Sequence, residues 1–441
     1  MKNYDLVVRC DHLVSMSGGR YEPLRDQMIG IVGSKIEFVG PWTPDGWKAT
    51  RTLHRPNSVV LPGLVNGHCH MAMTMFRGLA DDLPFDKWLH GYILPVEGKL
   101  VSADFVRTGA RLAALESLLG GVTTIVDMYY FQETTAEVLD ASGMRGLVGE
   151  GVADFPAPDN KSLDGSEYRL LDRLAERYGR HERVVPVIAP HAPYTCSDAT
   201  LKKAAEWARA KNLPLTIHVS ETKGEVEGQL KEHGKTPPRR LFDLGVMDTK
   251  QTIFAHCVHL TDDDMALLAK TGTSAIHNPE SNMKLGAGAA RIRKMLDLGL
   301  KVGLGTDGTA SNNDLNMFKE MDVAAKLQKL SNADNTAMTA AQALRMATYD
   351  GARALGLGDL TGSLEAGKRA DFIVVSLDEP HMRPLHDLAA QLVYAATGQE
   401  VRDVFVDGRQ LVDDRRCLTI ERDALYADVE RIQGLMKTVI G

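Results

Sequence analysis

Eight short runs rich in Val, Ile, Leu, Thr and Gly recur along the chain, separated by longer stretches with apolar residues at helical spacing. Such runs are typical of strands buried on both faces, and their alternation with amphipathic helices predicts a parallel (β/α)8 TIM barrel. The predicted strands are Val59–Asn66, Thr123–Tyr129, Arg145–Gly151, Val184–Pro190, Leu213–Glu221, Gln251–Cys257, Ser274–Pro279 and Lys301–Gly308. The predicted helices include Ser102–Leu119, Thr200–Lys211, Asp262–Lys270 and Ala290–Leu298.

An open, doubly wound α/β sheet could use the same elements. That fold binds nucleotides through a glycine-rich loop after an early strand, and no G-x-G-x-x-G loop follows an early strand here. The barrel is therefore favoured, and we expect it to span residues 59–365.

Two flanking segments, residues 1–58 and 366–441, do not fit the barrel pattern. Each contains short alternating runs, such as Met28–Val32 and Lys35–Val39 on one side and Val401–Val406 on the other, with turn residues between runs. We expect the two ends to meet in one small β-sandwich domain, with a closing helix near Glu421–Lys437.

The bulk properties exclude several classes of partner. A formal net charge of -7 argues against nucleic-acid binding, which favours a basic surface. The five cysteines show no CxxC spacing and suit a reducing compartment. The first ten residues lack the apolar core of a signal peptide, and no apolar stretch is long enough to span a bilayer. We therefore expect a cytoplasmic protein without a membrane partner.

Metal-binding residue types follow the first predicted barrel strand, in the sequence His68-Cys69-His70. Residues i and i+2 of a strand face the same side, so the two imidazoles can converge on a divalent ion. His218 ends the fifth predicted strand, and Asp307 ends the eighth. Because strand ends surround one mouth of a barrel, we expect His68, His70, His218 and Asp307 to bind one metal ion. The alternative is that the histidines are ordinary core residues and the aspartate caps a turn.

The ion is expected to be Zn²⁺, although imidazole and carboxylate also suit Fe²⁺ and Mn²⁺. Two-metal barrels often carry a carbamylated lysine at the end of strand four. Here that strand ends at Pro190-His191-Ala192-Pro193, without a lysine, which predicts a single ion.

The same barrel mouth supplies candidate acid and base groups. A bound metal lowers the pKa of a water molecule toward about 7 and so provides hydroxide. Glu221, three residues beyond His218, is placed to take the water proton and pass it to a ring nitrogen. His256, at the end of the sixth strand, could stabilise the incoming hydroxide, and Asp307 could move a second proton to departing ammonia.

Four segments resemble the amidohydrolase superfamily, and most closely its 5′-methylthioadenosine/S-adenosylhomocysteine deaminases. The segment Pro62–His70 resembles the metal-binding opening of the superfamily. The segments Pro190–Ser197, His277–Leu285 and Gly305–Asn313 resemble the strand-four, strand-seven and strand-eight segments of these deaminases. The resemblance implies hydrolytic deamination of the adenine ring of a nucleoside, and homo-oligomers are common in the superfamily.

The resemblance also implies a substrate pocket that includes Glu221 and Asp307. Glu97, in Leu94-Pro95-Val96-Glu97, resembles the acidic residue that binds the ribose hydroxyls. By the same resemblance, His191 contacts the purine and Trp88 walls the site.

The chain departs from the family pattern after strand three. Members that accept the homocysteine carboxylate use arginines there, and the matching positions fall near Glu150 and Ser162, with Lys161 adjacent. An anionic Glu150 would repel a substrate carboxylate. We therefore expect methylthioadenosine, adenosine or 5′-deoxyadenosine to be preferred over S-adenosylhomocysteine.

The sequence leaves two alternatives open. The same fold and metal could serve an s-triazine, pterin or guanine hydrolase, although such a ring needs no carboxylate at Glu97. A barrel without catalytic activity could serve as an assembly module, but such proteins usually lose metal ligands.

Overall fold

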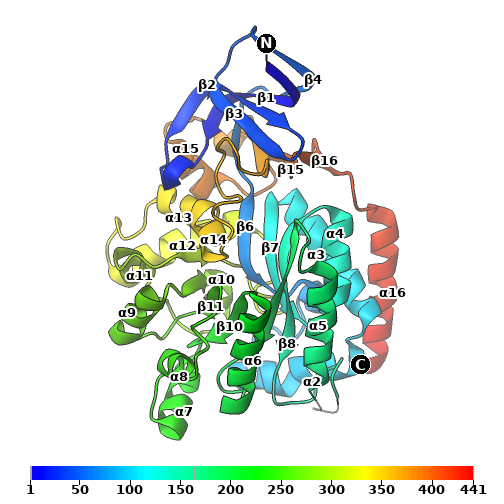
Figure 1. The fold of residues 1–441 in the computed structure, drawn as a ribbon, viewed down its shortest axis with the longest axis vertical. Coiled ribbons are helices and arrows are strands. Elements are labelled where there is room, and N and C mark those ends of the chain that lie inside the picture. Colours follow the sequence, from blue (N-terminus) through cyan, green and yellow to red (C-terminus); the bar gives the residue numbers. More distant parts are fainter. Residues whose placement is uncertain (1, 162–164, 441) are drawn as a thin grey trace.

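The computed structural model describes residues 2–161 and 165–440 and places a parallel barrel below a mixed sheet (Figure 1). The barrel strands are β6 (Leu64–Cys69), β7 (Val122–Tyr129), β8 (Arg145–Val152), β9 (Val184–Pro190), β10 (Leu215–Val219), β11 (Thr252–His256), β12 (Ser274–His277) and β13 (Val302–Leu304). Each strand pairs with its neighbours in chain order. The amide of Asp307, after β13, donates to the carbonyl of His68 in β6 at 3.0 Å. This bond links the first and last strands at the mouth, and the predicted (β/α)8 architecture is confirmed.

Helices cover the outside of the barrel. They are α3 (Ala103–Leu119), α4 (Gln132–Ser142), α5 (Ser166–Tyr178), α6 (Asp198–Lys211), α7 (Lys223–His233), α8 (Pro237–Asp243), α9 (Asp262–Thr271), α10 (Pro279–Lys284), α11 (Ile292–Asp297), α12 (Met317–Asn332), α13 (Ala340–Met346) and α14 (Tyr349–Ala354). Alternate strand residues pack on opposite sides of the barrel wall. Ile253 shares an apolar cluster with Val126 and Ile276 of other barrel strands, whereas the next residue, Phe254, belongs to a different cluster that includes many residues of the covering helices.

The prediction of one barrel strand over Val59–Asn66 is wrong. The run divides into β5 (Ser58–Pro62), which belongs to the mixed sheet, and β6, which opens the barrel. Gly63 lies between them, and a Cβ atom at that position would come within 2.1 Å of the Thr123 side chain. The chain can pass from one sheet to the other there because glycine permits this close approach.

The mixed sheet joins the two ends of the chain. It consists of β1 (Lys2–Val14), β2 (Pro23–Val32), β3 (Lys35–Pro41), β4 (Trp47–His54), β5, β14 (Phe372–Ser376), β15 (Val401–Val406), β16 (Arg409–Asp413) and β17 (Arg416–Cys417). Strand β14 pairs antiparallel with β5, which also pairs with β1. The expected meeting of the two termini in one β domain is therefore confirmed.

A buried ion-pair cluster fastens the mixed sheet to the barrel. Arg145 is the first residue of β8, and its guanidinium lies 2.8 Å from the carboxylate of Asp371 and 2.5 Å from that of Asp407. Both aspartates belong to the C-terminal part of the mixed-sheet region. The three side chains are nearly inaccessible to solvent, so the charges depend on one another for compensation.

The closing helix α16 (Arg422–Ile440) runs along the side of the barrel, next to α3 (Figure 1). Ile432 and Met436 of this helix join the apolar cluster that contains Trp88, Ile93 and Val96. Those three residues lie in α1 (Phe85–Trp88), the π-helical turn Leu89–Ile93 and α2 (Leu94–Leu100). Within residues 2–161 and 165–440, none of the helices has both the length and the apolar character that crossing a membrane requires.

Candidate active site

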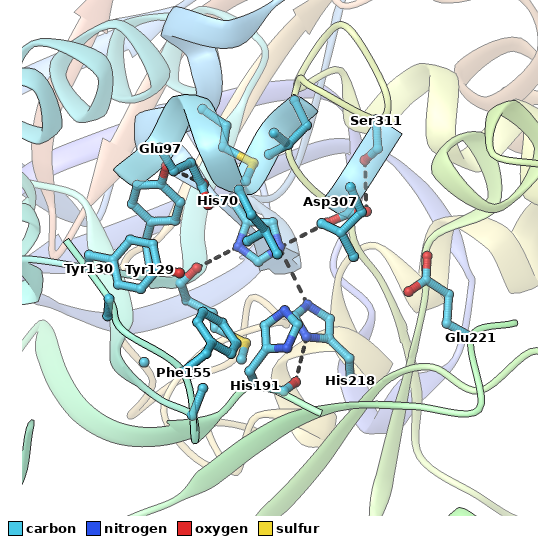
Figure 2. Close-up of a pocket in the computed structure, with 18 of the residues that line it drawn as sticks. His70, Glu97, Tyr129, Tyr130, Phe155, His191, His218, Glu221, Asp307 and Ser311 are labelled. Carbon is cyan, nitrogen blue, oxygen red and sulfur yellow. Dashed lines mark hydrogen bonds and ion pairs between the residues drawn. The ribbon is translucent and has the colours of Figure 1, made fainter. Parts of the chain in front are cut away.

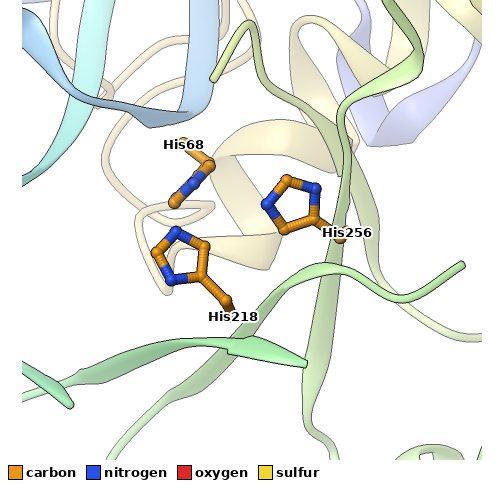
Figure 3. Close-up of side chains that lie close together, drawn as sticks. All are labelled: His68, His218 and His256. Atoms are coloured by element: carbon orange, nitrogen blue, oxygen red, sulfur yellow. The ribbon is translucent and has the colours of Figure 1, made fainter. Parts of the chain in front are cut away.

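Five predicted site residues converge at the C-terminal end of the barrel. His68 lies in β6, His70 follows it, His218 lies in β10, His256 ends β11, and Asp307 follows β13. One ligand atom from each of His68, His218 and His256 lies within 4.8 Å of the others, and the same holds for His68, His70 and Asp307. Figure 3 shows the rings of His68, His218 and His256 gathered around one point.

The side-chain nitrogens of this cluster are arranged as metal ligands. The Nδ1 of His70 lies 2.5 Å from the carbonyl of Met128, and the Nδ1 of His218 lies 2.6 Å from that of His191. A carbonyl can only accept, so each Nδ1 carries a proton, which leaves the Nε2 atom of each ring for a metal. The two Nε2 atoms lie 3.4 Å apart, close enough to bind one cation together.

His68 gives a second indication of a metal. Its ring is fully buried, and neither nitrogen makes a hydrogen bond within the described part of the chain. Burial lowers the pKa of His68 to about 4, which keeps the ring neutral. A buried neutral imidazole without hydrogen bonds is costly unless a ligand occupies its lone pair. The residues present therefore fit a divalent ion.

Asp307 divides its two oxygens between different partners. Oδ1 lies 3.1 Å from Nε2 of His70 and 3.4 Å from Nε2 of His68. Oδ2 accepts hydrogen bonds from Ser281 at 2.6 Å and Ser311 at 2.8 Å. Burial alone would raise the pKa of Asp307, but the two imidazoles hold it well below its ordinary value. One carboxylate oxygen thus faces the histidines while the serines fix the other.

Glu221 and His256 form a neighbouring acid–base pair. Oε1 of Glu221 lies 3.8 Å from Nδ1 of His256, and that nitrogen also lies 2.9 Å from the side-chain oxygen of Asn282. Burial raises the pKa of Glu221. Burial would lower the pKa of His256, but the carboxylates of Glu221 and Asp307 raise it. Both side chains line the same pocket, so an acid and a base face the same space.

The remaining wall of the pocket is mainly apolar and aromatic (Figure 2). Phe85, Trp88 and Leu89 contribute from the segment after β6, and Tyr130 and Phe155 contribute from the loops after β7 and β8. The indole nitrogen of Trp88 is buried and has no hydrogen-bond partner within residues 2–161 and 165–440.

Glu97 is the buried carboxylate of this apolar wall. Its side chain is 3% exposed, and Oε1 accepts a hydrogen bond of 2.5 Å from the hydroxyl of Tyr129 (Figure 2). Burial raises the pKa of Glu97 to about 7, although the bond from Tyr129 opposes the rise. His191, after β9, also lines the pocket, and burial lowers the pKa of its imidazole to about 3.

The predicted site residues are thus brought together, with His68 buried beside the pocket and the others on its surface. Tyr129, Ser281 and Ser311 were not predicted. Tyr129 ends β7, so its place at a strand end was a usable signal. The two serines lie within segments that carried the family resemblance, but nothing in the sequence indicated that both bond to Asp307.

Glu150 does not act as expected from the sequence. It is buried in β8, and its carboxylate accepts the amide of Gln132 at the start of α4 at 3.0 Å. It is not among the residues that line the pocket. Burial and the neighbouring carboxylate of Asp159 raise its pKa well above the ordinary value. Because its side chain does not line the pocket, it does not face substrate. Ser162 lies outside the described residues, and Lys161 is exposed.

Comparisons with known proteins agree with this arrangement. The model of the amidohydrolase family matches residues 59–411. A 5-methylthioadenosine/S-adenosylhomocysteine deaminase of Syntrophobacter fumaroxidans is 43% identical over 96% of this chain and 95% of its own length. A 5′-deoxyadenosine deaminase of Methanosarcina mazei is 39% identical over 97% of each chain. The crystal structure of an adenosine deaminase from Xanthomonas campestris with bound zinc superposes with a TM-score of 0.96 at 36% identity, over 99% of each chain.

Proposed function

The chain belongs to the amidohydrolase family, and we propose that it is a zinc-dependent deaminase of 5′-modified adenosines. The reaction replaces the amino group of the adenine ring with oxygen and releases ammonia and the inosine analogue. One observation carries the proposal: a single pocket joins the histidine cluster and Glu221 to a buried carboxylate, Glu97, across an apolar wall. Such a pocket offers hydrolytic groups to the base and an acceptor to the ribose hydroxyls.

His68, His70, His218 and Asp307 would hold the metal ion. When bound, a divalent ion supplies a water molecule activated for attack at neutral pH. Zinc is favoured because the Xanthomonas campestris deaminase contains it and because imidazole and carboxylate suit it. The carbonyls of Met128 and His191 accept from Nδ1 of His70 and His218, which orients the two Nε2 atoms for this role.

Glu221 is the proton carrier in this mechanism. Its carboxylate takes a proton from the attacking water and delivers it to the ring nitrogen next to the carbon under attack. The raised pKa of Glu221 helps, because a carboxyl group that titrates nearer neutrality both gains and releases a proton readily. His256 donates a hydrogen bond to the oxygen that adds to the ring, and Asp307 directs the second proton to the departing ammonia.

The other pocket residues position the nucleoside. His191 contacts the purine, Trp88 walls the site, and Glu97 accepts hydrogen bonds from the ribose hydroxyls. The bond from Tyr129 occupies Oε1 of Glu97 and leaves Oε2 for substrate. Burying a carboxylate oxygen without a hydrogen-bond partner in an apolar wall costs free energy unless a ligand bonds to it. This favours a ribosyl substrate over a bare heteroaromatic ring.

The 5′ substituent is proposed to be neutral. No Lys or Arg of the described residues lines the pocket, so a homocysteine carboxylate would find no cationic partner there. Glu150 has no part in this preference, because its carboxylate faces the start of α4. Methylthioadenosine, 5′-deoxyadenosine and adenosine are therefore proposed as better substrates than S-adenosylhomocysteine.

A substrate panel tests the proposal directly. Ammonia release is measured with metal-analysed protein on methylthioadenosine, 5′-deoxyadenosine, adenosine, S-adenosylhomocysteine, guanine and an amino-s-triazine. We expect turnover of the adenosine compounds with one metal ion per chain. Turnover of only guanine or the triazine would refute the nucleoside pocket. A larger kcat/KM for S-adenosylhomocysteine than for methylthioadenosine would refute the neutral 5′ site, and zinc-loaded protein without activity on any compound would favour a non-catalytic role.

A further inference from the structure

A tight turn carries Glu221 from the end of β10 into the pocket. Ser220, the residue before it, has a φ of 54°, a left-handed conformation that is uncommon outside glycine. The carbonyl of Ser220 accepts the amide of His259 at 2.9 Å, which attaches one side of the turn to the loop after β11. The direction in which Glu221 points therefore depends on how this turn is held.

Glu225 holds the other side of the same turn. Its Oε1 accepts the amide of Ser220 at 2.9 Å, and its Oε2 accepts the amide of Glu221 at 2.8 Å. The Glu225 side chain is buried, on the first turn of α7. Both carboxylate oxygens are thus used on two consecutive amides, which fixes the orientation of the peptide unit joining Ser220 and Glu221.

Helix capping does not account for this contact. Thr222 is the N-cap of α7, and its hydroxyl accepts the amide of Glu225 at 3.1 Å. In a capping box the residue at the position of Glu225 binds back to the N-cap amide, as Asp264 does with Thr261 at the start of α9 at 2.9 Å. Glu225 instead reaches past Thr222 to the two residues before it. Thr222 therefore caps the helix, whereas the Glu225 carboxylate binds the backbone of the turn.

We propose that Glu225 is a positioning residue for Glu221, which it holds in the orientation needed to transfer protons to and from substrate. The inference rests on the proposed deaminase function. Glu225 lies outside the residues that line the pocket and acts only through the backbone of the turn. Catalytic groups lose efficiency when displaced by about an ångström, so a defect in this turn should affect turnover more than substrate binding.

Glu225→Gln tests the proposal, because the amide keeps the shape of the side chain but turns one acceptor into a donor that faces an N–H group. We expect kcat for methylthioadenosine to fall by about 10- to 100-fold, with KM and the metal content unchanged. Thr222→Ala is the matched control, since it removes the helix cap of α7 and leaves the Glu225 carboxylate in place. It should lower the melting temperature and leave kcat near that of the wild type.

The Glu221→Gln background separates positioning from a general structural role. If Glu225 acts through Glu221, adding Glu225→Gln to Glu221→Gln should lower kcat no further. Wild-type kcat in Glu225→Gln, an equal loss in both backgrounds, or the same loss in Thr222→Ala would overturn the proposal. If Glu225→Gln fails to fold, Glu225→Asp, which retains the charge with shorter reach, undergoes the same comparison. Absence of nucleoside turnover in the wild type would refute the proposed function instead.

Discussion

The hydroxyl of Tyr129 donates to Oε1 of Glu97 over 2.5 Å, and both side chains are buried in the pocket wall. Tyr129 follows Met128, whose carbonyl accepts the Nδ1–H of the proposed metal ligand His70. Two consecutive residues at the end of β7 therefore orient a group at the proposed metal site and a group at the proposed ribose site. One strand thus sets the distance between the two proposed sites.

The pKa of Glu97 predicts that substrate affinity falls in acid. The value is about 7, above the ordinary 4.5, so the carboxylate form that accepts ribose hydroxyls is lost as the pH falls through about 7. Measured KM for methylthioadenosine should rise about tenfold from pH 8 to pH 6. Glu97→Gln should raise KM and abolish this pH dependence. A wild-type KM that is flat over this range would contradict the role of Glu97.

One variant should lose turnover but keep its metal, and a second variant should lose both. Glu221→Gln removes the proton carrier but no proposed ligand, so kcat should fall by about 10²- to 10⁴-fold with metal still bound. His218→Ala removes a ligand and should lose both metal and activity. Elemental analysis together with steady-state kinetics distinguishes the two outcomes. Wild-type turnover by Glu221→Gln would overturn the assignment of the proton carrier.

Metal removal should weaken the fold as well as the activity. The imidazole of His68 has no hydrogen bonds within the described residues, and Nε2 atoms of His70 and His218 face each other at 3.4 Å. A ligand at a hundredfold excess over its Kd stabilises the folded state by about 2.7 kcal/mol. Dialysis against a chelator should therefore lower the melting temperature and abolish turnover, and added zinc should restore both. A melting temperature that does not respond to chelator and zinc would count against a metal in this cluster.

Arg145 should contribute to stability and not to catalysis. Arg145→Met leaves Asp371 and Asp407 buried without their shared cation, and breaking such a cluster costs about 3–5 kcal/mol. Arg145 starts β8, at the end opposite the pocket, so kcat of the folded protein should not change. Urea unfolding measures the loss. Arg107→Met, which removes the exposed pair with Glu137, is the matched control and should cost less than about 1 kcal/mol.

Residue periodicity predicted the barrel because each buried strand and covering helix has its own local pattern. Strand ends then predicted that His218, His256 and Asp307 would lie together, since the C-terminal ends of barrel strands share one mouth. The run over Val59–Asn66 was misassigned because strands of both sheets are buried there and share the same composition. Only Gly63, whose Cβ would collide with Thr123, marks the boundary.

Side-chain direction was harder to predict than position. Glu150 lies near the pocket in sequence and in space, but its carboxylate turns toward the start of α4, where an amide is available. The pocket walls present the same difficulty. Phe85 and Phe155 lie outside the barrel strands, where no simple periodicity indicates which side chains turn inward, and Trp88 was predicted only through the family resemblance.

The packing of α16 on the segment that bears Trp88 and Glu97 also affects the order in which the enzyme is completed during synthesis. A ribosome that has made every barrel strand has not yet made Ile432 and Met436, which share an apolar cluster with Trp88 and Val96. The proposed metal ligands can therefore be assembled on a nascent chain in which the proposed nucleoside-binding wall still lacks part of its support. A chain interrupted before α16 would keep the proposed metal ligands and lose that support for substrate recognition.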